Sequence, residues 1–476
     1  MKRELIVDCR SGGMRAAVLE DGELVELHME GGEPDRQTET LYYGRVQAVR
    51  PSVHAAFVEI GQELNAFLPL EEGVKLKSGD MLIVQGVAKQ TTQSKGLRVS
   101  TRINLTGRAL VLIPGETGVH ISKKVKNPET RARLAEIGRA ICPPDCAIIR
   151  TASETVSAEQ LQAEAEMLLK SWQETNQRAK GMVKPGALTK PEPLSLRLTR
   201  DLAGNLERVV INDGDEFDAL RQAQKDGRLP PQTHIEYADE QKTLLFDAFN
   251  LETPIDKALK KRVWLPCGGY LIFDFAEALT VIDVNSGKMV TGKSMEETAL
   301  RVNLEAVKEL ARQLRLRDVG GIVIVDLIDM EKDKNRQAVL TTLKDAVKSD
   351  RMPVKIEGIT RLGLLEMTRK RKGEQLRRAL RTTCSVCSGS GELLCEEEIA
   401  RRALRQARRM ALAGQRGPFV VCLSEKAAKV LAAMPQPENC PPVYALASGG
   451  YREKFSVMQP CEGEIPEQAS ALQTDK

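Results

Sequence analysis

Two aspartates, Asp283 and Asp326, each lie in a run of apolar, mostly β-branched residues that predicts a β-strand, at 279–284 and 321–328. An ionised carboxylate among such residues costs free energy unless it is paired with a cation or coordinates a metal ion. The long segment between the strands has apolar residues at spacings of three and four, which is typical of an amphipathic helix. Strand, helix and strand together predict a βαβ unit with parallel strands and a right-handed crossover.

The two carboxylates indicate a divalent-ion site at one end of this sheet. Neighbouring strands lie about 5 Å apart, so Asp283 and Asp326 can share one ion. A small number of oxygen ligands favours Mg²⁺ or Mn²⁺, which keeps several waters and leaves room for a phosphate. Asn285 is expected on the same face as Asp283, where it can bond a phosphate or a metal-bound water. For either aspartate alone, the alternative is a helix cap or an ion pair with a buried arginine.

A second chemical feature is the thiol pair Cys384 and Cys387, which small residues follow. This spacing provides half of a structural zinc site, which requires four ligands. The four histidines lie far away in the sequence, and the chain has no second Cys-x-x-Cys. The economical solution is a Cys₄ zinc site that two chains share across a two-fold axis. The alternatives are a redox dithiol and a third ligand from the same chain, Cys395.

Length and composition are typical of a folded protein with several domains. The chain has 476 residues, whereas a single core rarely exceeds roughly 250 to 300 residues. Its hydrophobic content is 42% and its charged content 29%, which argues against a disordered protein. The net charge of +4 predicts no partner by itself, but basic residues gather at 361–381 and 401–409, a pattern that attracts polyanions.

The sequence also predicts a cytoplasmic location. No apolar run at the start is long enough for a signal peptide, and no segment approaches a membrane span. Ten cysteines without a regular framework suit a reducing compartment.

Turn-forming residues divide the first part of the chain into short strands. The pair Asp21–Gly22 predicts a hairpin within residues 4–28. Over residues 41–104, short strands alternate with turns that contain Pro or Gly. Such a series favours a small barrel, with the OB-fold as the leading candidate.

The rest of the chain is predicted to be mixed. Residues 105–180 combine strands with a helix, 180–193 are expected to form a linker, and 195–283 return to an α/β pattern. After Cys387 we expect a mostly helical tail, with disorder over residues 461–476.

Several segments between Met1 and about Leu393 carry a resemblance to a known family. They are 55–61 (AAFVEIG), 66–68 (AFL), 149–152 (IRTA), 280–285 (TVIDVN), 311–317 (ARQLRLR), 325–330 (VDLIDM) and 363–369 (GLLEMTR). Together they resemble the ribonuclease E/G family, and in particular its shorter, ribonuclease G-like members. A resemblance over this length is far more specific than one short motif.

The resemblance implies an endoribonuclease that cuts single-stranded, A/U-rich RNA in rRNA and tRNA processing and in mRNA decay. It also implies 5′-phosphate and 3′-hydroxyl products and a preference for 5′-monophosphorylated substrates. By the family pattern, Asp283 and Asp326 hold the catalytic Mg²⁺ and Asn285 assists them. The zinc that bridges the family's dimers falls on Cys384 and Cys387. Dimers that pair into tetramers are a further expectation.

The family's architecture implies a multidomain fold of α/β and β parts. The parts expected here are an RNase H-like subdomain (1–36 plus 195–260), an inserted OB-fold RNA-binding domain (37–101), a 5′-sensor subdomain (102–194), a DNase I-like α/β catalytic subdomain (261–383), a zinc link (384–391) and a small helical or α+β C-terminal dimerisation domain with a disordered tail (392–476).

The barrel is expected to bind RNA. Phe57 and Phe67 match the family's stacking aromatics, and Lys95 matches its phosphate contact. Stacking of a base on an aromatic ring is worth about 1–3 kcal/mol and tolerates any sequence. The alternative for Phe57 is core packing, because its neighbours are apolar.

The family's pocket for the 5′ end falls on Gly107, Val111, Arg150 and Thr151. An arginine can bind a terminal phosphate through two parallel hydrogen bonds, and a hydroxyl with backbone amides can complete the site. A further position, often basic in the family, falls on Pro353, which departs from the pattern.

Two other functions compete with the metal-dependent endoribonuclease. One is a non-catalytic RNA-binding or ribosome-assembly factor that uses only the barrel and the basic helices. The other is a DNA-directed nuclease, because a metal site does not itself read the 2′-hydroxyl. The presence of Asp283, Asp326 and Asn285 together weighs against the non-catalytic alternative.

Overall fold

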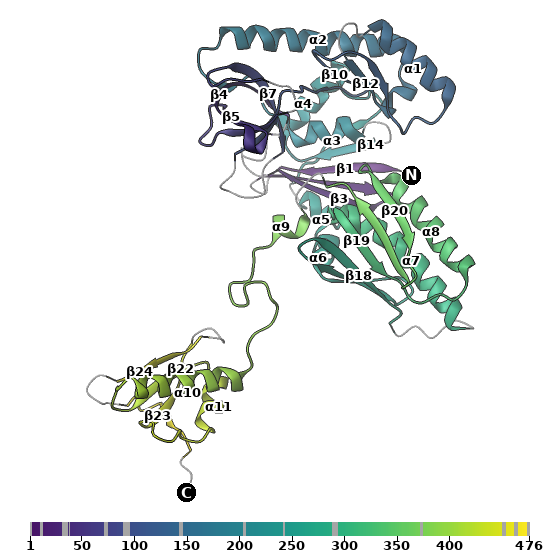
Figure 1. Ribbon diagram of the computed structural model, residues 1–476. Helices are drawn as coiled ribbons and strands as arrows, with labels where there is room; N and C mark the ends of the chain where they lie inside the picture. Colours follow the sequence, from purple (N-terminus) through teal and green to yellow (C-terminus); the bar gives the residue numbers. More distant parts are fainter. Residues whose placement is uncertain are drawn as a thin grey trace. The chain divides into compact units, whose positions relative to one another are not determined.

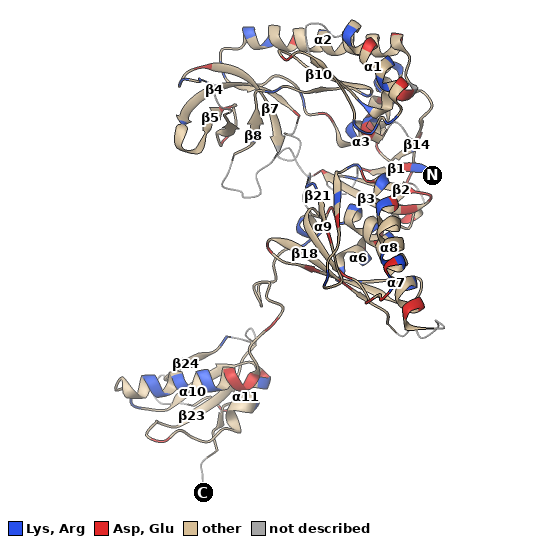
Figure 2. Ribbon diagram, turned by 45° about the vertical axis from the view of Figure 1, so that its right-hand side comes forward, with Lys and Arg blue, Asp and Glu red and all other residues tan. Residues whose placement is uncertain are grey.

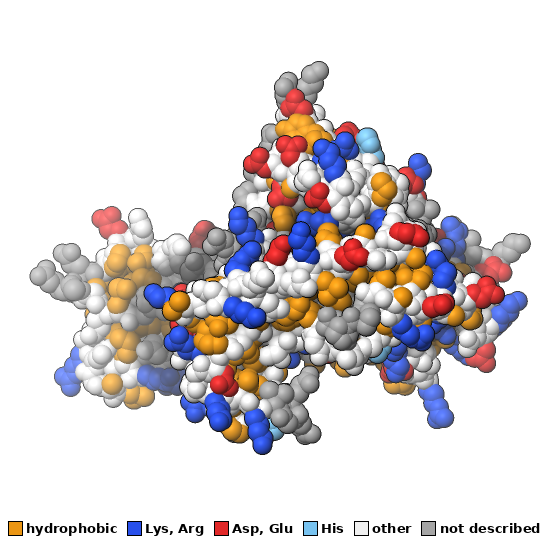
Figure 3. All heavy atoms as spheres, turned by 90° about the horizontal axis from the view of Figure 1, so that it is seen from above, with side chains coloured by type: hydrophobic (Ala, Val, Ile, Leu, Met, Phe, Trp, Pro, Cys, Tyr) orange, Lys and Arg blue, Asp and Glu red, His pale blue; other side chains and the backbone are white. Residues whose placement is uncertain are grey.

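A computed structural model describes most of the chain. The described residues are 2–9, 13–30, 37, 39–70, 75–88, 96–141, 146–202, 206–240, 243–287, 294–371, 375–449, 454–460 and 465–473. The chain forms two compact units, Met1–Arg377 and Arg378–Lys476 (Figure 1). Within the described ranges, no helix has both the length and the apolar character needed to cross a membrane. Acidic and basic side chains are interspersed on the face shown in Figure 3.

The first unit contains a five-stranded sheet in the order β15-β14-β1-β2-β3. The expected hairpin forms at Asp21 and Gly22, whose φ angles of 49° and 84° allow the tight turn. Because β1 pairs in parallel with β14, this sheet unites the segments 1–36 and 195–260; the label RNase H-like stays a prediction. Its strands are β1 (Arg3–Asp8), β2 (Met14–Glu20), β3 (Glu23–Glu30), β14 (Leu206–Ile211) and β15 (His234–Tyr237), with helices α3 (Leu194–Leu202), α4 (Gly214–Lys225), α5 (Leu245–Ala248) and α6 (Glu252–Leu259).

Between these segments lies a closed barrel, as the turn pattern predicted. Its strands follow the order β4-β5-β6-β8-β7, and β7 pairs back to β4. Val58, Leu68, Val84 and Val99 point inwards and form part of its core. The five closed strands confirm the expected small OB-like barrel. They are β4 (Leu41–Arg50), β5 (Ala55–Glu59), β6 (Ala66–Pro69), β7 (Met81–Ala88) and β8 (Arg98–Ser100), and the short β13 (Gly186–Ala187) adds to β4.

The segment after the barrel is a four-stranded sheet with two helices packed on it. The order is β11-β12-β10-β9, and α1 contacts β11 while α2 contacts β10. α2 begins with a capping box, in which Ser157 and Gln160 satisfy each other's backbone amides. The elements are β9 (Leu105–Thr106), β10 (Leu110–Ile113), β11 (Val119–Ile121), α1 (Pro128–Ile141), β12 (Cys146–Ile149) and α2 (Ala158–Gly181).

The two aspartates lie in a six-stranded sheet of the order β16-β17-β18-β19-β21-β20. β18 and β19 are parallel, and α7 connects them, which confirms the predicted βαβ unit. Apolar residues of the sheet pack with those of α7 and α8 in one core. The elements are β16 (Arg262–Trp264), β17 (Tyr270–Phe275), β18 (Leu279–Asn285), α7 (Met295–Leu316), β19 (Gly321–Asp326), α8 (Asp333–Ala346), β20 (Val354–Ile359) and β21 (Leu364–Arg369).

The other face of this sheet is partly exposed among the described residues. Ile282 and Val323 are fully buried against the helices, but Val281 and Ile322, which point the opposite way, are 37% and 47% exposed. The apolar character of these strands therefore does not place their carboxylates in a low-dielectric interior.

The second unit is an α/β domain, so the expectation of a mostly helical tail is wrong. Its sheet has the order β24-β22-β23-β25. Leu472 is buried in the core, and residues 465–473 are described, so the expected disorder of 461–476 is wrong for that segment. The elements are α9 (Leu376–Leu380, which starts in the first unit), α10 (Glu396–Leu412), β22 (Phe419–Leu423), α11 (Glu425–Ala432), β23 (Val443–Ala447), β24 (Ser456–Met458) and β25 (Ser470–Ala471).

A buried ion network joins α7 to the first sheet. Arg315 of α7 donates to Glu20 of β2 at 2.8 Å and to Glu26 of β3 at 3.0 Å. The side chains of Arg315 and Glu26 are only 4% and 8% exposed. Burial alone would raise the pKa of Glu26, but a hydrogen bond with His28 and the charges of Arg351 and Arg315 lower it well below its usual value. The network therefore fixes α7, and with it the sheet of the two aspartates.

We predict that Arg315→Met destabilises the first unit by about 3–5 kcal/mol at neutral pH, because two buried carboxylates lose a cation. Because the folded-state pKa of Glu26 is lowered, its contribution is present above the ordinary glutamate pKa and is lost as the pH falls through the lowered value. The variant's deficit in unfolding free energy should therefore shrink in acid, as urea denaturation at several pH values would measure.

The matched control is Arg301→Met, which removes an exposed partner of Glu305 from the same helix. A surface pair contributes about 0–1 kcal/mol, so this variant should unfold nearly as the parent does. Equal stability of the two variants would contradict the structural role of Arg315.

Candidate active site

Asp283 and Asp326 lie directly opposite each other on neighbouring strands. They form the last paired positions of the parallel β18–β19 ladder. Paired residues point to the same side of a sheet, and here that side is the open face. Asp283 is half-buried and Asp326 is exposed. The strand spacing of about 5 Å places both carboxylates within reach of one ion, accessible from solvent.

Asn285 orients the first of these carboxylates. Its Nδ2 donates a hydrogen bond of 2.7 Å to Oδ2 of Asp283. The amide therefore restrains the carboxylate on the same face. The expectation that Asn285 bonds a phosphate or a metal-bound water stays a prediction.

The donor set fits a hard divalent cation. Among the described residues, no group of three or more His, Cys, Asp or Glu side chains is arranged to hold a metal ion. Two carboxylates are nevertheless enough for Mg²⁺, which is commonly bound through one or two carboxylates while it keeps several waters. The open face leaves space for those waters and for a phosphate.

The aromatics expected to bind RNA lie on the outside of the barrel. Phe57 and Phe67 are paired across β5 and β6, and their ring centroids are 6.0 Å apart in an edge-to-face arrangement. Both are half-buried, while Ala56, Val58 and Leu68 on alternate positions point into the core. Core packing therefore does not account for Phe57. Lys95 lies outside the described residues.

The four residues expected to bind the 5′ end lie in one region. Nη1 of Arg150 donates to the carbonyl oxygen of Gly107 at 2.7 Å, and Nη2 donates to Oδ1 of Asp201 at 2.8 Å. Thr151 follows Arg150, and Val111 of β10 is paired with the residue two positions before Arg150. Both terminal nitrogens of the Arg150 guanidinium therefore already have an acceptor. The contact with Asp201 was not predicted from the sequence.

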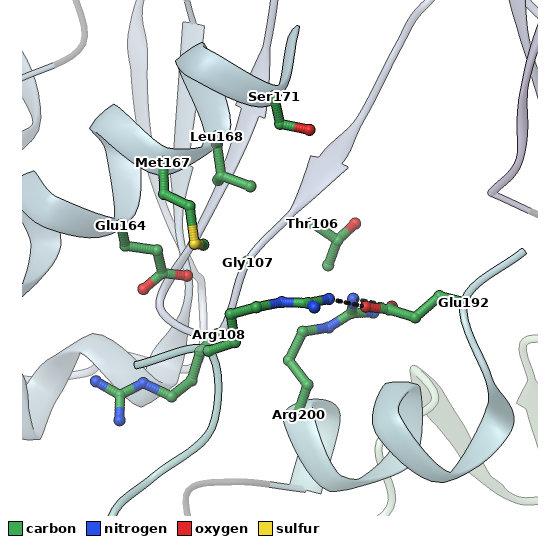
Figure 4. A pocket seen from close by; sticks show the side chains of 10 residues that line it. Thr106, Gly107, Arg108, Glu164, Met167, Leu168, Ser171, Glu192 and Arg200 are labelled. Atoms are coloured by element: carbon green, nitrogen blue, oxygen red, sulfur yellow. Dashed lines mark hydrogen bonds and ion pairs between the residues drawn. The ribbon is translucent and has the colours of Figure 1, made fainter. Parts of the chain in front are cut away.

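A pocket of about 340 Å³ is lined by Gly107 and by residues of α2 and α3 (Figure 4). Its wall holds Arg200 and Arg228, which both donate to Glu192. These opposite charges satisfy one another within the wall. The pocket adjoins the expected 5′-end residues but presents a mixed rather than a purely basic lining.

The thiol pair lies in a turn in which a backbone amide is directed at one of the two sulfurs. The backbone amide of Gly391 lies 3.4 Å from the sulfur of Cys387. The positive φ angles of Gly389 and Gly391 allow this turn. Backbone hydrogen bonds from Gly391 and Gly389 lower the pKa of the Cys387 thiol. Cys384 is exposed and Cys387 is half-buried.

Comparison with known proteins decides the family. A family model described as "Ribonuclease E/G family" matches residues 104–372, which contain both aspartates and the expected 5′-end residues. Ribonuclease G of Haemophilus influenzae is 35% identical over 456 residues, which cover 90% of this chain and 91% of the relative. The chain belongs to the ribonuclease E/G family.

Further relatives in the ribonuclease E/G family differ in length. Ribonuclease G of Escherichia coli K12 is 33% identical over 90% of this chain and 92% of its own length. Ribonuclease E of the same strain is also 33% identical, over 87% of this chain but only 41% of its own length. The predicted similarity to ribonuclease G-like members is confirmed.

Helix α7 supplies positioning residues that the sequence reading missed. Asn303 is fully buried; its Nδ2 donates to the Ile328 carbonyl at 2.8 Å, and its Oδ1 accepts from the Ile328 amide at 3.1 Å. These two hydrogen bonds restrain the segment that follows Asp326. Two residues further along α7, Glu305 accepts from the amide of Cys267 in the β16–β17 turn at 2.8 Å. A polar residue within the apolar stripe of the helix was the signal that could have revealed Asn303.

Glu164 also escaped the sequence reading. It is 8% exposed, and its carboxylate accepts from the amide of Ala109 at 3.0 and 3.2 Å. Burial raises the pKa of Glu164 above its usual value. A Cβ added to Gly107 would lie 2.0 Å from Oε1 of this carboxylate. Gly107 is therefore required by packing, independently of any role toward RNA.

We predict that Gly107→Ala lowers the unfolding free energy by about 1–3 kcal/mol, as insertion of a methyl group into a packed site does. The fixed Glu164 must move away or lose its amide partner. Gly181→Ala, at the end of α2 with no atom near the added methyl, is the matched control. It should be neutral or stabilising by about 0.5–1 kcal/mol. Urea denaturation measures both, and equal effects would contradict the packing role.

Proposed function

We propose that this endoribonuclease cuts single-stranded, A/U-rich RNA with Mg²⁺ or Mn²⁺ held between Asp283 and Asp326, and that it acts in rRNA and tRNA processing and in mRNA decay. The observation that carries the proposal is the in-register pairing of the two aspartates on an open sheet face. An RNA backbone can approach this face, because among the described residues the helices of the core, α7 and α8, pack on the opposite face.

Each residue of the site has a separate task. Asp283 and Asp326 would hold the cation, and Asn285 restrains the Asp283 carboxylate through its hydrogen bond of 2.7 Å. When bound, a divalent ion lowers the pKa of coordinated water and neutralises charge on a phosphate under attack. Attack of water from the side opposite the 3′ oxygen leaves a 5′-phosphate and a 3′-hydroxyl. Asn303 keeps the end of β19 in place throughout.

Recognition of the RNA strand falls to the barrel. Phe57 and Phe67 are accessible enough to stack on bases, and Lys95 is proposed to contact a phosphate. This mode of binding tolerates many sequences and suits single strands, since paired bases cannot open onto the rings. Basic side chains also follow α10 (Figure 2), where Arg401, Arg402, Arg405, Arg408 and Arg409 are all exposed.

Preference for a 5′-monophosphate is proposed to depend on Arg150 and its neighbours. A terminal phosphate must compete with Asp201 for Nη2, because that carboxylate is its present partner. Thr151 offers a hydroxyl beside the guanidinium, while Pro353 offers no charge. The preference for a 5′-monophosphate should therefore be smaller than it would be if Arg150 had no carboxylate partner.

We predict that Asp326→Asn reduces Mg²⁺-dependent cleavage of a single-stranded A/U-rich RNA by at least about 100-fold, as the loss of a carboxylate ligand removes bound metal. RNA binding, measured by anisotropy in EDTA, should remain near the parent value. Asp274→Asn, which changes an exposed carboxylate on the same face paired with Lys261, should cleave normally.

The preference for the 5′ end is measured by the parent protein's cleavage of two matched substrates, one with a 5′-monophosphate and one with a 5′-hydroxyl.

Retained cleavage by Asp326→Asn would contradict the metal site. Binding without cleavage by the parent protein would favour a non-catalytic RNA-binding factor, and equal cutting of matched DNA would remove the restriction to RNA.

We also propose that Cys384 and Cys387 of two chains share one structural Zn²⁺ in a homodimer. The exposed Cys384 and the amide-bonded Cys387 fit half of a Cys₄ site. Zinc removal or Cys384→Ser should convert the dimer to a monomer, as light scattering would measure. Cys395→Ser, which removes a nearby exposed thiol, should leave the mass and zinc content unchanged. Loss of zinc from the Cys395→Ser variant would instead support a ligand set completed within one chain.

A further inference from the structure

Two aromatic side chains and an arginine form an exposed cluster at the edge of the catalytic sheet. Trp264 of β16 is 61% exposed, although tryptophan is usually largely buried. Its ring lies 5.1 Å from that of Tyr270 in β17, with an interplanar angle of 62°. The guanidinium carbon of Arg262 lies 4.6 Å from the centre of the Tyr270 ring and 5.6 Å from that of Trp264. We refer to these three side chains as the aromatic edge cluster.

The strand register places the aromatic edge cluster in line with the candidate active site. Trp264 is paired with Tyr270, and Tyr270 is paired with Asn285. The three residues therefore project from the same face of the sheet, the open face that carries Asp283 and Asp326. Trp264 is two strands away from Asn285, which corresponds to about 10 Å between backbones. This distance is short enough for one RNA strand to contact both.

Close packing fixes the turn that carries Trp264. The amide of Cys267 in this turn donates to Glu305 of α7 at 2.8 Å. A Cβ on Gly269 would lie 2.7 Å from the Asn285 carbonyl oxygen, and one on Gly287 would lie 2.3 Å from the Gly268 carbonyl oxygen. The β16–β17 turn thus packs directly against the end of β18. A rigid, exposed aromatic pair costs little conformational entropy when a planar ligand binds.

We propose that the aromatic edge cluster binds a nucleobase of the RNA next to the bond that is cut, with the base stacked on Trp264 and Arg262 contacting a neighbouring phosphate. This inference rests on the proposed nuclease function. Every base offers a flat face for stacking, and an arginine beside the rings supplies the positive charge that the two aspartates lack. The cluster would determine where the strand lies relative to Asp283 and Asp326.

Tryptophan fluorescence tests the contact without any need for cleavage. The chain has only two tryptophans, so Trp172→Phe leaves Trp264 as the single reporter. In a Trp172→Phe, Asp326→Asn variant, a single-stranded A/U oligomer should quench the emission of Trp264 with the same concentration dependence as binding by anisotropy. A matched duplex should quench it much less. Saturated binding of the single strand with unchanged emission would overturn the proposal.

Cleavage kinetics test what the contact does. Trp264→Ala should lower kcat/KM roughly 5- to 100-fold, the range that loss of one stacked base gives, and Trp264→Phe should restore most of it. The parent protein should cleave an oligomer with an abasic site at one position near the cut with a similarly lowered kcat/KM. The kcat/KM of Trp264→Ala should differ little between this oligomer and the intact one. Tyr237→Ala, which removes an exposed aromatic from another sheet, is the control and should cleave as the parent does.

The outcomes separate the two claims. Cleavage by Trp264→Ala at the parent rate, with Asp326→Asn inactive, would overturn the stacking role and leave the nuclease intact. Loss of cleavage by Trp264→Ala together with a lower mass in light scattering would also overturn it, because the cluster would then be a contact between chains. Absence of cleavage by the parent protein would refute the proposed function itself, whereas the fluorescence result would still stand.

Discussion

Parallel pairing of β18 with β19 brings together two carboxylates that are 43 positions apart in the chain (326 − 283). Because side chains alternate along a strand, a slip of one residue in this register would turn Asp326 toward the core and separate the pair. Helix α7 maintains the register in two ways. Its apolar side chains bury the covered face of both strands, and Asn303 bonds the backbone directly after β19. The geometry of the site is thus a consequence of how this one helix packs.

The same helix connects the site to the rest of the first unit. Arg315 near its end is held by Glu20 and Glu26 of the first sheet, and Glu305 holds the turn before Tyr270. Buried ion pairs contribute little net stability, but they favour one arrangement over others, since an unpaired buried charge is costly. We infer that these polar contacts specify the position of α7, while the apolar stripe supplies the burial.

Hydrophobic periodicity was sufficient to predict the βαβ unit, and turn residues were sufficient to predict the barrel. The open face was not predictable in this way, because Val281 and Ile322 are as apolar as the buried residues beside them. The strands of the second unit were missed because they are short and follow the strongly amphipathic α10. Asp201 was missed for another reason: its pairing with Arg150 joins residues far apart in sequence, and no local pattern encodes such a contact.

The central claim is that Asp283 and Asp326 jointly hold the divalent ion at which RNA is cut. The most direct test is to bind Fe²⁺ in place of Mg²⁺, generate hydroxyl radicals with ascorbate and peroxide, and map the breaks in the polypeptide by mass spectrometry. Breaks should occur near Asp283 and near Asp326, and excess Mg²⁺ should suppress them. Asp283→Asn or Asp326→Asn alone should abolish the breaks at both places. Breaks elsewhere, or breaks that persist in the variants, would contradict the shared site.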